Sequence, residues 1–118
     1  MASDPAFCDD VTDRLTPMGT VMGKRMFGGF GVFMDGLMFG LIADDAFYLK
    51  VDDENRAAFE DAGMEPFTYL RKGKPASLGY WAVPPDVFDD PDGLLDWARD
   101  AHAVAKRAAA GKRSGKKR

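Results

Sequence analysis

The sequence predicts an α+β fold in which helices pack on an antiparallel sheet. At 118 residues the chain is long enough for one core of two packed layers and too short for two such cores. Apolar residues recur at helical spacing near both ends of the chain. In the middle they alternate as in strands, and short turn signals divide this part of the sequence into hairpins. The predicted order is α-β-β-β-α-β-β-α, a two-layer arrangement with an antiparallel five-stranded sheet.

The first helix is predicted from its start signal and its apolar stripe. Asp4-Pro5 combines an N-cap residue with proline at the first helical position. Apolar side chains then recur at every fourth position from Phe7 to Leu15, and Thr16-Pro17 ends the helix.

The glycine-rich stretch MFGGFGVFMDG at positions 26–36 is predicted to enter a sheet and not to hold a phosphate. It lacks the third glycine of a dinucleotide fingerprint, and it does not fit the spacing of a Walker loop. Dinucleotide-binding and Walker loops both place a phosphate at a helix N-terminus, whereas the residues that follow here predict a β-hairpin.

Two turns are predicted within this strand-rich segment, which runs from about Val21 to Val51. Asp35-Gly36 is a strong type I′ hairpin signal, and Asp44-Asp45 is a weaker one. If Asp35-Gly36 forms the turn, Gly31 lies opposite Gly40, and this bare pair would let a helix approach the sheet closely. Gly28-Gly29 is interpreted as a bulge or bend where the first strand enters the sheet.

The predicted register sorts the apolar side chains into two faces. The face on which a helix is expected to dock carries Phe33, Met38, Ile42, Phe47, Leu49 and Val51. The opposite face carries Phe30, Val32, Met34, Leu37, Phe39, Leu41 and Tyr48. Since a monomer seldom exposes so large an apolar surface, one of the chain's own helices, a second copy or another protein must cover it. The hypothesis is that this second face makes, wholly or partly, a homodimer or partner interface.

The second half of the chain predicts helix, hairpin and helix. Asp52-Asp53 is an N-cap signal, and Gly63 is placed to end the helix that follows as a left-handed cap. The β-rich runs PFTYL and LGYWAV flank a turn-forming RKGKPAS segment. Asp90-Pro91 then opens an amphipathic helix that is predicted to end the domain near residue 105.

Charge divides the chain into an acidic domain, residues 1–105, and a basic tail, residues 106–118, that is expected to be disordered. The tail holds seven of the 16 basic residues and no acid, so the rest carries 9 basic and all 19 acidic residues, a net charge of -10. Weak, salt-sensitive nucleic-acid binding is one hypothesis for the tail, through Lys112, Arg113, Lys116, Lys117 and Arg118. Basic residues 71–74 beside aromatics allow a second hypothesis, single-stranded nucleic-acid binding by the domain, although half-buried packing also explains these aromatics.

The sequence predicts no catalytic residue, cofactor or metal site. His102 is expected to be a partly exposed bystander, because no second histidine or suitably spaced nucleophile accompanies it. Cys8 is expected to be a small buried side chain, and adjacent acid pairs lie at predicted caps and turns. With no export signal, no apolar run of membrane-spanning length and one cysteine, a cytoplasmic protein is expected. An enzyme or small-molecule binder remains the last alternative.

Residues 25–84 resemble the N-terminal domain of the TfoX/Sxy family, the regulators of natural competence. The resemblance lies in RMFGGFG, the Asp-Gly turn, ADDAFYLKVD, the F-x-x-A-G-M-x-P-F-x-Y run and GYWAVP. It implies an α+β fold in the order given above and a non-enzymatic role. Longer members act as transcriptional co-activators alongside the cyclic-AMP receptor protein, so a transcription factor or polymerase partner is expected. Those members carry a second, helical domain, and this chain is expected to be a stand-alone version without it.

Overall fold

The computed structural model describes residues 4–26 and 28–115 of the chain. Its elements follow in the order α1 (Pro5–Arg14), η1 (Thr16–Met18), β1 (Val21–Met26), β2 (Gly29–Met34), β3 (Leu37–Ala43), β4 (Ala46–Lys50), α2 (Arg56–Asp61), β5 (Pro66–Arg71), β6 (Lys74–Ala82), α3 (Pro85–Phe88) and α4 (Pro91–Gly115). The α+β class and the antiparallel sheet are therefore confirmed.

The strands form a six-stranded sheet in the order β1-β2-β3-β4-β6-β5, and every described pair is antiparallel. The prediction of five strands is wrong because the segment before Asp35 contains two strands. Met26 pairs with Gly29, and between them Gly28 has a φ of 75°, which a glycine adopts without strain. Gly28-Gly29 thus belongs to a tight turn between β1 and β2 and not to a bulge at the sheet entrance.

The two predicted Asp turns are confirmed. Asp35 and Gly36 have φ values of 57° and 76°, and Asp44 and Asp45 have 51° and 57°, as a type I′ turn requires at both central residues. A third turn of this kind, Lys72-Gly73 with φ values of 53° and 79°, joins β5 to β6. These turns fix the register at the ends of three hairpins.

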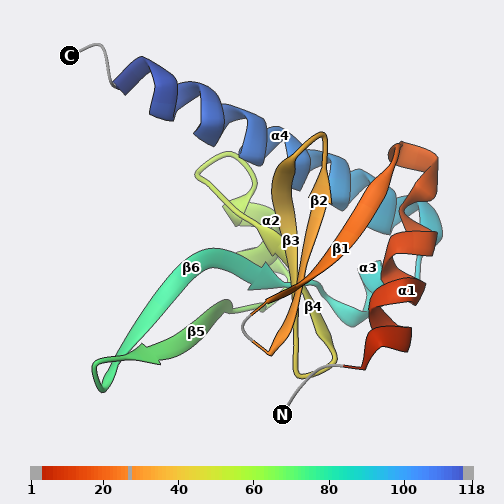
Figure 1. The fold of residues 1–118 in the computed structure, drawn as a ribbon, viewed down its shortest axis with the longest axis horizontal. Coiled ribbons are helices and arrows are strands. Elements are labelled where there is room, and N and C mark those ends of the chain that lie inside the picture. Colours follow the sequence, from red (N-terminus) through yellow and green to blue (C-terminus); the bar gives the residue numbers. More distant parts are fainter. Residues whose placement is uncertain (1–3, 27, 116–118) are drawn as a thin grey trace.

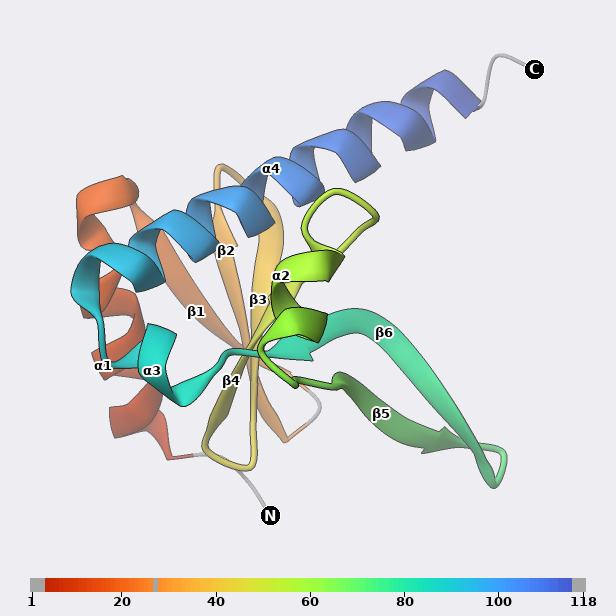
Figure 2. The same ribbon diagram turned by 180° about the vertical axis from the view of Figure 1, so that it is seen from behind.

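The helices lie on one side of the sheet. Figure 1 views the sheet with α4 passing behind the strands, and Figure 2, seen from behind, shows α2, α3 and α4 in front of them, with α1 beside β1. The buried core joins α1 and α4 to this side of the sheet through Val11, Leu15, Val32, Leu94 and Ala98, among others. The opposite side of the sheet carries none of the described helices.

Helix starts follow the predicted caps at two of three places. Asp4 accepts a hydrogen bond from the Ala6 amide at 2.9 Å, and α4 begins at Pro91 as predicted. However, α2 begins at Arg56 and not directly after Asp52-Asp53, because Asn55 is its N-cap residue. The Asp52 carboxylate instead accepts from the Glu54 amide at 2.9 Å in the preceding loop.

The last helix is longer than predicted. Leu94, Ala98 and Ala101 are fully buried along its sheet-facing stripe, and the helix continues past residue 105 to Gly115. The expectation of a disordered tail is therefore wrong for residues 106–115, where the alanine-rich sequence favours helix. Residues 116–118 lie outside the described part of the chain.

Candidate contact surface on the open face of the sheet

A β-bulge exchanges the two predicted faces across part of the sheet. Val32 pairs with Gly40 and Phe33 with Met38, so Phe39 is an extra residue on β3. Beyond this point the predicted pairing is shifted by one, because Gly31 lies opposite Leu41 and not opposite Gly40. A shift of one residue moves side chains to the other face of a sheet.

Five of the seven residues assigned to the partner face therefore face the helices. Phe30, Val32 and Phe39 are buried in the core, and Met34 and Leu37 pack against that core half-buried. The remaining two, Leu41 and Tyr48, pair with each other on the side without helices. The interface hypothesis cannot hold for the buried residues, because α1 and α4 already cover that face.

The predicted bare pair of glycines does not exist. A side chain on Gly31 would meet Met26 and Phe33, whereas one on Gly40 would meet the Phe47 ring, so each glycine makes room for a neighbouring side chain of the sheet. The glycine at which a helix docks is Gly23, where an added Cβ would collide with the Cys8 sulfur of α1.

We call the side of the sheet that no described helix covers the open face. The register and ring contacts place on it Met22, Lys24, Met26, Phe33, Met38, Leu41, Tyr48, Lys50, Phe67, Tyr69 and Tyr80. Its chemistry is aromatic and methionine-rich, with lysine as the charged residue. Met22 exposes 63% of its surface, whereas Leu41 at the centre exposes only 2% because its neighbours close over it.

The six strands contain no acidic residue, although the chain has 19. Their charged residues are Lys24, Arg25, Lys50, Arg71 and Lys74. All Asp and Glu residues lie in helices, turns, loops or terminal segments. Charge is therefore segregated along the chain: the strands carry only basic charges while the acids lie outside them, and a net charge of -3 conceals this division.

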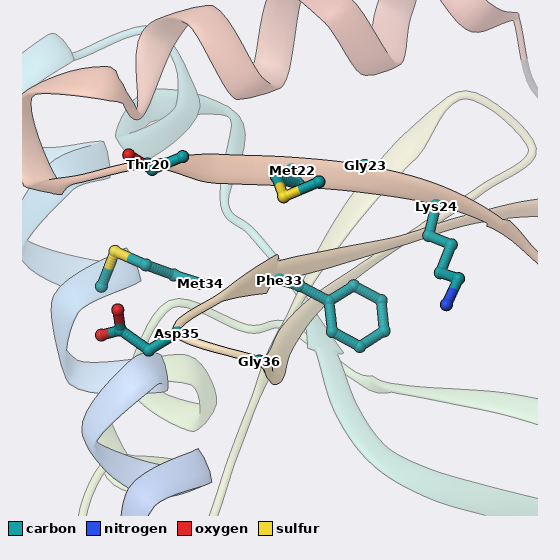
Figure 3. Close-up of a pocket in the computed structure, with 8 residues that line it drawn as sticks. All are labelled: Thr20, Met22, Gly23, Lys24, Phe33, Met34, Asp35 and Gly36. Atoms are coloured by element: carbon teal, nitrogen blue, oxygen red, sulfur yellow. The ribbon is translucent and has the colours of Figure 1, made fainter.

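A shallow hollow marks the β1 end of the open face. It has a volume of about 390 Å³ and is lined by Thr20, Met22, Gly23, Lys24, Phe33, Met34, Asp35 and Gly36. Figure 3 shows the Phe33 ring and the Lys24 side chain projecting from neighbouring strands, with Met22 above them on β1. The lining is mostly apolar with one cation and one carboxylate, which suits a protein side chain better than a phosphate.

Aromatic side chains occupy the other end of the open face. The ring centroids of Tyr48 and Phe67 are 5.1 Å apart in an edge-to-face contact, and those of Phe67 and Tyr69 are 6.4 Å apart with planes 19° from parallel. The Tyr80 hydroxyl donates to the Met38 carbonyl at 3.3 Å, and burial raises its pKa to about 12. Tyr80 is therefore a neutral structural donor across the face.

The two side chains best suited to chemistry, His102 and Cys8, are buried in the fold. His102 exposes only 5% of its surface, so the expectation of a partly exposed histidine is wrong. Its Nε2 donates to the Met34 carbonyl at 3.0 Å. Cys8 is buried as predicted, and burial, followed by the charge of Asp9, raises its thiol pKa, which is the opposite of what a reactive thiolate needs. The described residues contain no group of three or more His, Cys, Asp or Glu arranged to hold a metal ion.

The basic tail residues are only partly placed. Lys112 and Arg113 belong to the last turns of α4, while Lys116, Lys117 and Arg118 lie outside the described residues. Among the described residues, no helix is both long and apolar enough to cross a membrane.

Fold and surface together define an α+β domain that buries Cys8, Tyr80 and His102 and presents an apolar sheet face with lysine as its charged residue. The chain belongs to the TfoX N-terminal domain family, whose profile matches residues 13–105. It is 32% identical over 84 residues to the DNA transformation protein TfoX1 of Aliivibrio fischeri, covering 71% of this chain and 40% of that relative. It is also 29% identical over 100 residues to an uncharacterized 12.7 kDa protein in the trpE 5′ region of Spirochaeta aurantia, covering 84% of this chain and 80% of that protein. This chain thus spans two fifths of the TfoX1 relative.

Sequence reasoning missed several residues of the open face. The predicted register places Phe33 and Met38 on the helix side, and it assigns Met22, which lies in the predicted strand-rich segment, to neither face. The β-bulge could not be predicted, because the alternation of apolar and polar residues shows a bulge only where one side of the strand is polar. Both sides of β2 and β3 are apolar, so the parity of the pattern carried no information about the bulge.

Proposed function

We propose that this protein is a non-enzymatic regulatory module that acts by binding another protein through the β1 end of its open face. The observation that carries the proposal is the uncovered apolar surface around Met22, Phe33 and Met38, with its hollow of about 390 Å³. An exposed apolar surface rimmed by polar groups is typical of a protein interaction site. Methionine suits such a surface, because its flexible side chain adapts to different partners.

The family supports the class of partner. A relative is named as a DNA transformation protein, so we propose that this chain serves the control of competence or a related transcriptional programme in the cytoplasm. A transcription factor or a polymerase subunit is the expected partner. A non-enzymatic role is supported by the burial of Cys8 and His102, each of which exposes only 5% of its surface.

A homodimer is the alternative occupant of this surface. Two copies meeting face to face would bring together two surfaces that each carry Lys24, and the Asp35 turn is the acidic group that lines the hollow beside it. Like charges at an interface disfavour association. A different protein with acidic residues around an apolar anchor satisfies the surface better than a second copy does.

Site-specific photo-crosslinking tests the proposal. A photoreactive residue at position 22 is expected to capture a transcription factor or polymerase subunit in the native cell. The matched control is position 57 on α2, an exposed alanine that is not part of the open face. Equal capture at both positions, or capture at position 22 of a second copy alone, contradicts the proposal.

A further inference from the structure

The β5–β6 hairpin projects from the rest of the molecule, as Figures 1 and 2 show. Its tip is the Lys72-Gly73 turn, and the exposed side chains of Arg71, Lys72 and Lys74 surround that turn. No acidic residue lies between Pro66 and Ala82. The hairpin is therefore a cationic arm on a domain whose acids lie elsewhere.

Aromatic rings lead from the sheet toward this tip. Tyr48 on β4 contacts Phe67 at 5.1 Å between ring centroids, and Phe67 neighbours Tyr69 at 6.4 Å. All three side chains are half-buried, so each also presents surface to solvent. Lys50 lies at the inner end of this row, with its Nζ 5.0 Å from the Tyr80 ring centroid. We call Tyr48, Phe67 and Tyr69 the aromatic row.

The aromatic row and its flanking cations match one type of ligand. We propose that the β5–β6 arm and the adjoining β4 end of the open face bind single-stranded nucleic acid, with Arg71, Lys72, Lys74 and Lys50 contacting phosphates and the aromatic row stacking on bases. Single strands bind proteins through this combination of a cationic track and aromatic platforms. Bases paired in a duplex cannot stack on rings that lie within a sheet face.

Other occupants fit this end of the face less well. A second copy that meets the arm through the same sheet face would place cations against cations, because the strands lack acidic residues. An acidic protein segment would satisfy the charges, but its carboxylate side chains offer no aromatic base on each backbone unit to stack on three neighbouring rings. The site also lies away from the Met22 hollow, so it is independent of the proposed protein contact.

Fluorescence anisotropy with the full chain and a labelled oligothymidylate of about 12 nucleotides, at low salt, tests the proposal. Binding is expected, and Tyr69→Ala should weaken it about tenfold because one stacking platform is lost. Tyr69→Phe keeps the ring and should retain binding. Replacing both Arg71 and Lys74 by Gln should make the slope of log affinity against log salt shallower by about 1.4.

The control variants carry cations elsewhere. Arg99→Gln on α4 removes an exposed charge from the acidic side, and a second control replaces Lys112, Arg113, Lys116, Lys117 and Arg118 by Gln. Both should retain the sensitivity to Tyr69. Circular dichroism and thermal melting verify folding, and if Tyr69→Ala fails to fold, the Arg71 and Lys74 variant with its salt slope decides.

Four results would overturn the proposal. The first two are no binding at low salt and equal affinity for a duplex of the same length. The third is loss of binding in the five-residue C-terminal variant alone, and the fourth is displacement of the oligonucleotide by polyglutamate whose own binding depends on Tyr69. The last result would assign the arm to an acidic protein partner. A negative result here leaves the crosslinking at position 22 unaffected, so the two proposals fail separately.

Discussion

His102 on α4 donates a hydrogen bond from Nε2 to the main-chain carbonyl of Met34 on β2, at 3.0 Å. A carbonyl oxygen only accepts, so Nε2 carries the hydrogen in this contact. The same ring meets Phe39 edge-on, with centroids 5.6 Å apart. One side chain thus anchors the longest helix to the sheet at the end of the β2–β3 hairpin and fills space beside the bulge.

Replacing His102 by Ala should lower the free energy of unfolding by about 2–4 kcal/mol. The substitution leaves the Met34 carbonyl without its donor and opens a cavity beside Phe39. Urea denaturation monitored by circular dichroism measures the change. The exposed Lys106→Ala on the same helix is the control and should change stability by less than about 0.5 kcal/mol. Equal effects of the two substitutions would contradict the anchoring role.

Gly23→Ala should destabilise the protein by about 1–3 kcal/mol, because the new methyl group collides with the Cys8 sulfur where α1 packs on β1. Cys8→Ala removes that sulfur, so adding the methyl group should cost less in the Cys8→Ala background. A double-mutant cycle of unfolding free energies measures this coupling. Additive effects would show that the strain arises elsewhere.

Gly111→Ala is the matched glycine control. No atom lies within 4 Å of an added Cβ there, and the residue is helical. Alanine favours helix over glycine, so this substitution should stabilise the protein or leave it unchanged. A loss of stability at both glycines would indicate a general intolerance and not a specific collision.

The turns of this fold were predictable because their chemistry is local. Asp35-Gly36 and Asp44-Asp45 are residue types that tolerate the positive φ values of a type I′ turn. The structure has positive φ values at all four residues. The caps at Asp4 and Gly63 follow for the same reason. Sequence signals that fix the backbone within a few residues therefore predicted these turns and caps correctly.

The faces of the sheet were not predictable to the same degree. One extra residue, Phe39, shifts the register and moves Phe33 and Met38 to the open face. The burial of His102 was not predictable for a different reason, since its hydrogen-bond partner lies 68 residues away in the sequence. The spacing of residues along the chain does not predict such long-range contacts. The candidate surface could therefore be defined only from the observed pairing of the strands.

The contact between Arg107 and Asp52 predicts an acid-dependent loss of stability. Arg107 donates from Nε and Nη2 to the two Asp52 oxygens at 2.9 and 3.0 Å, and these hydrogen bonds lower the pKa of the Asp52 carboxyl. A lowered folded pKa contributes stability above the ordinary value of 3.8, and that stability is lost as pH falls through the folded value. Asp52→Asn should therefore melt at a lower temperature than the parent at pH 7.

The difference between the parent and Asp52→Asn should shrink below about pH 4, where Asp52 protonates in the unfolded chain. Thermal melting at a series of pH values measures it, with Asp61→Asn, an exposed residue at the end of α2, as the control. High salt should also reduce the difference, because both partners are partly exposed. A difference that stays constant from pH 7 to pH 3 would rule out the ion pair as its source.

Phe39 and Met22 give the sharpest test of which face of the sheet is covered. Phe39 is fully buried against α4, so Phe39→Ala should cost about 3–5 kcal/mol of unfolding free energy. Met22 exposes 63% of its surface, so Met22→Ala should change stability by less than about 0.5 kcal/mol while weakening partner capture. Urea midpoints compare the two directly. If Met22→Ala were as costly as Phe39→Ala, the open face would be packed within the folded chain and would not be free for a partner.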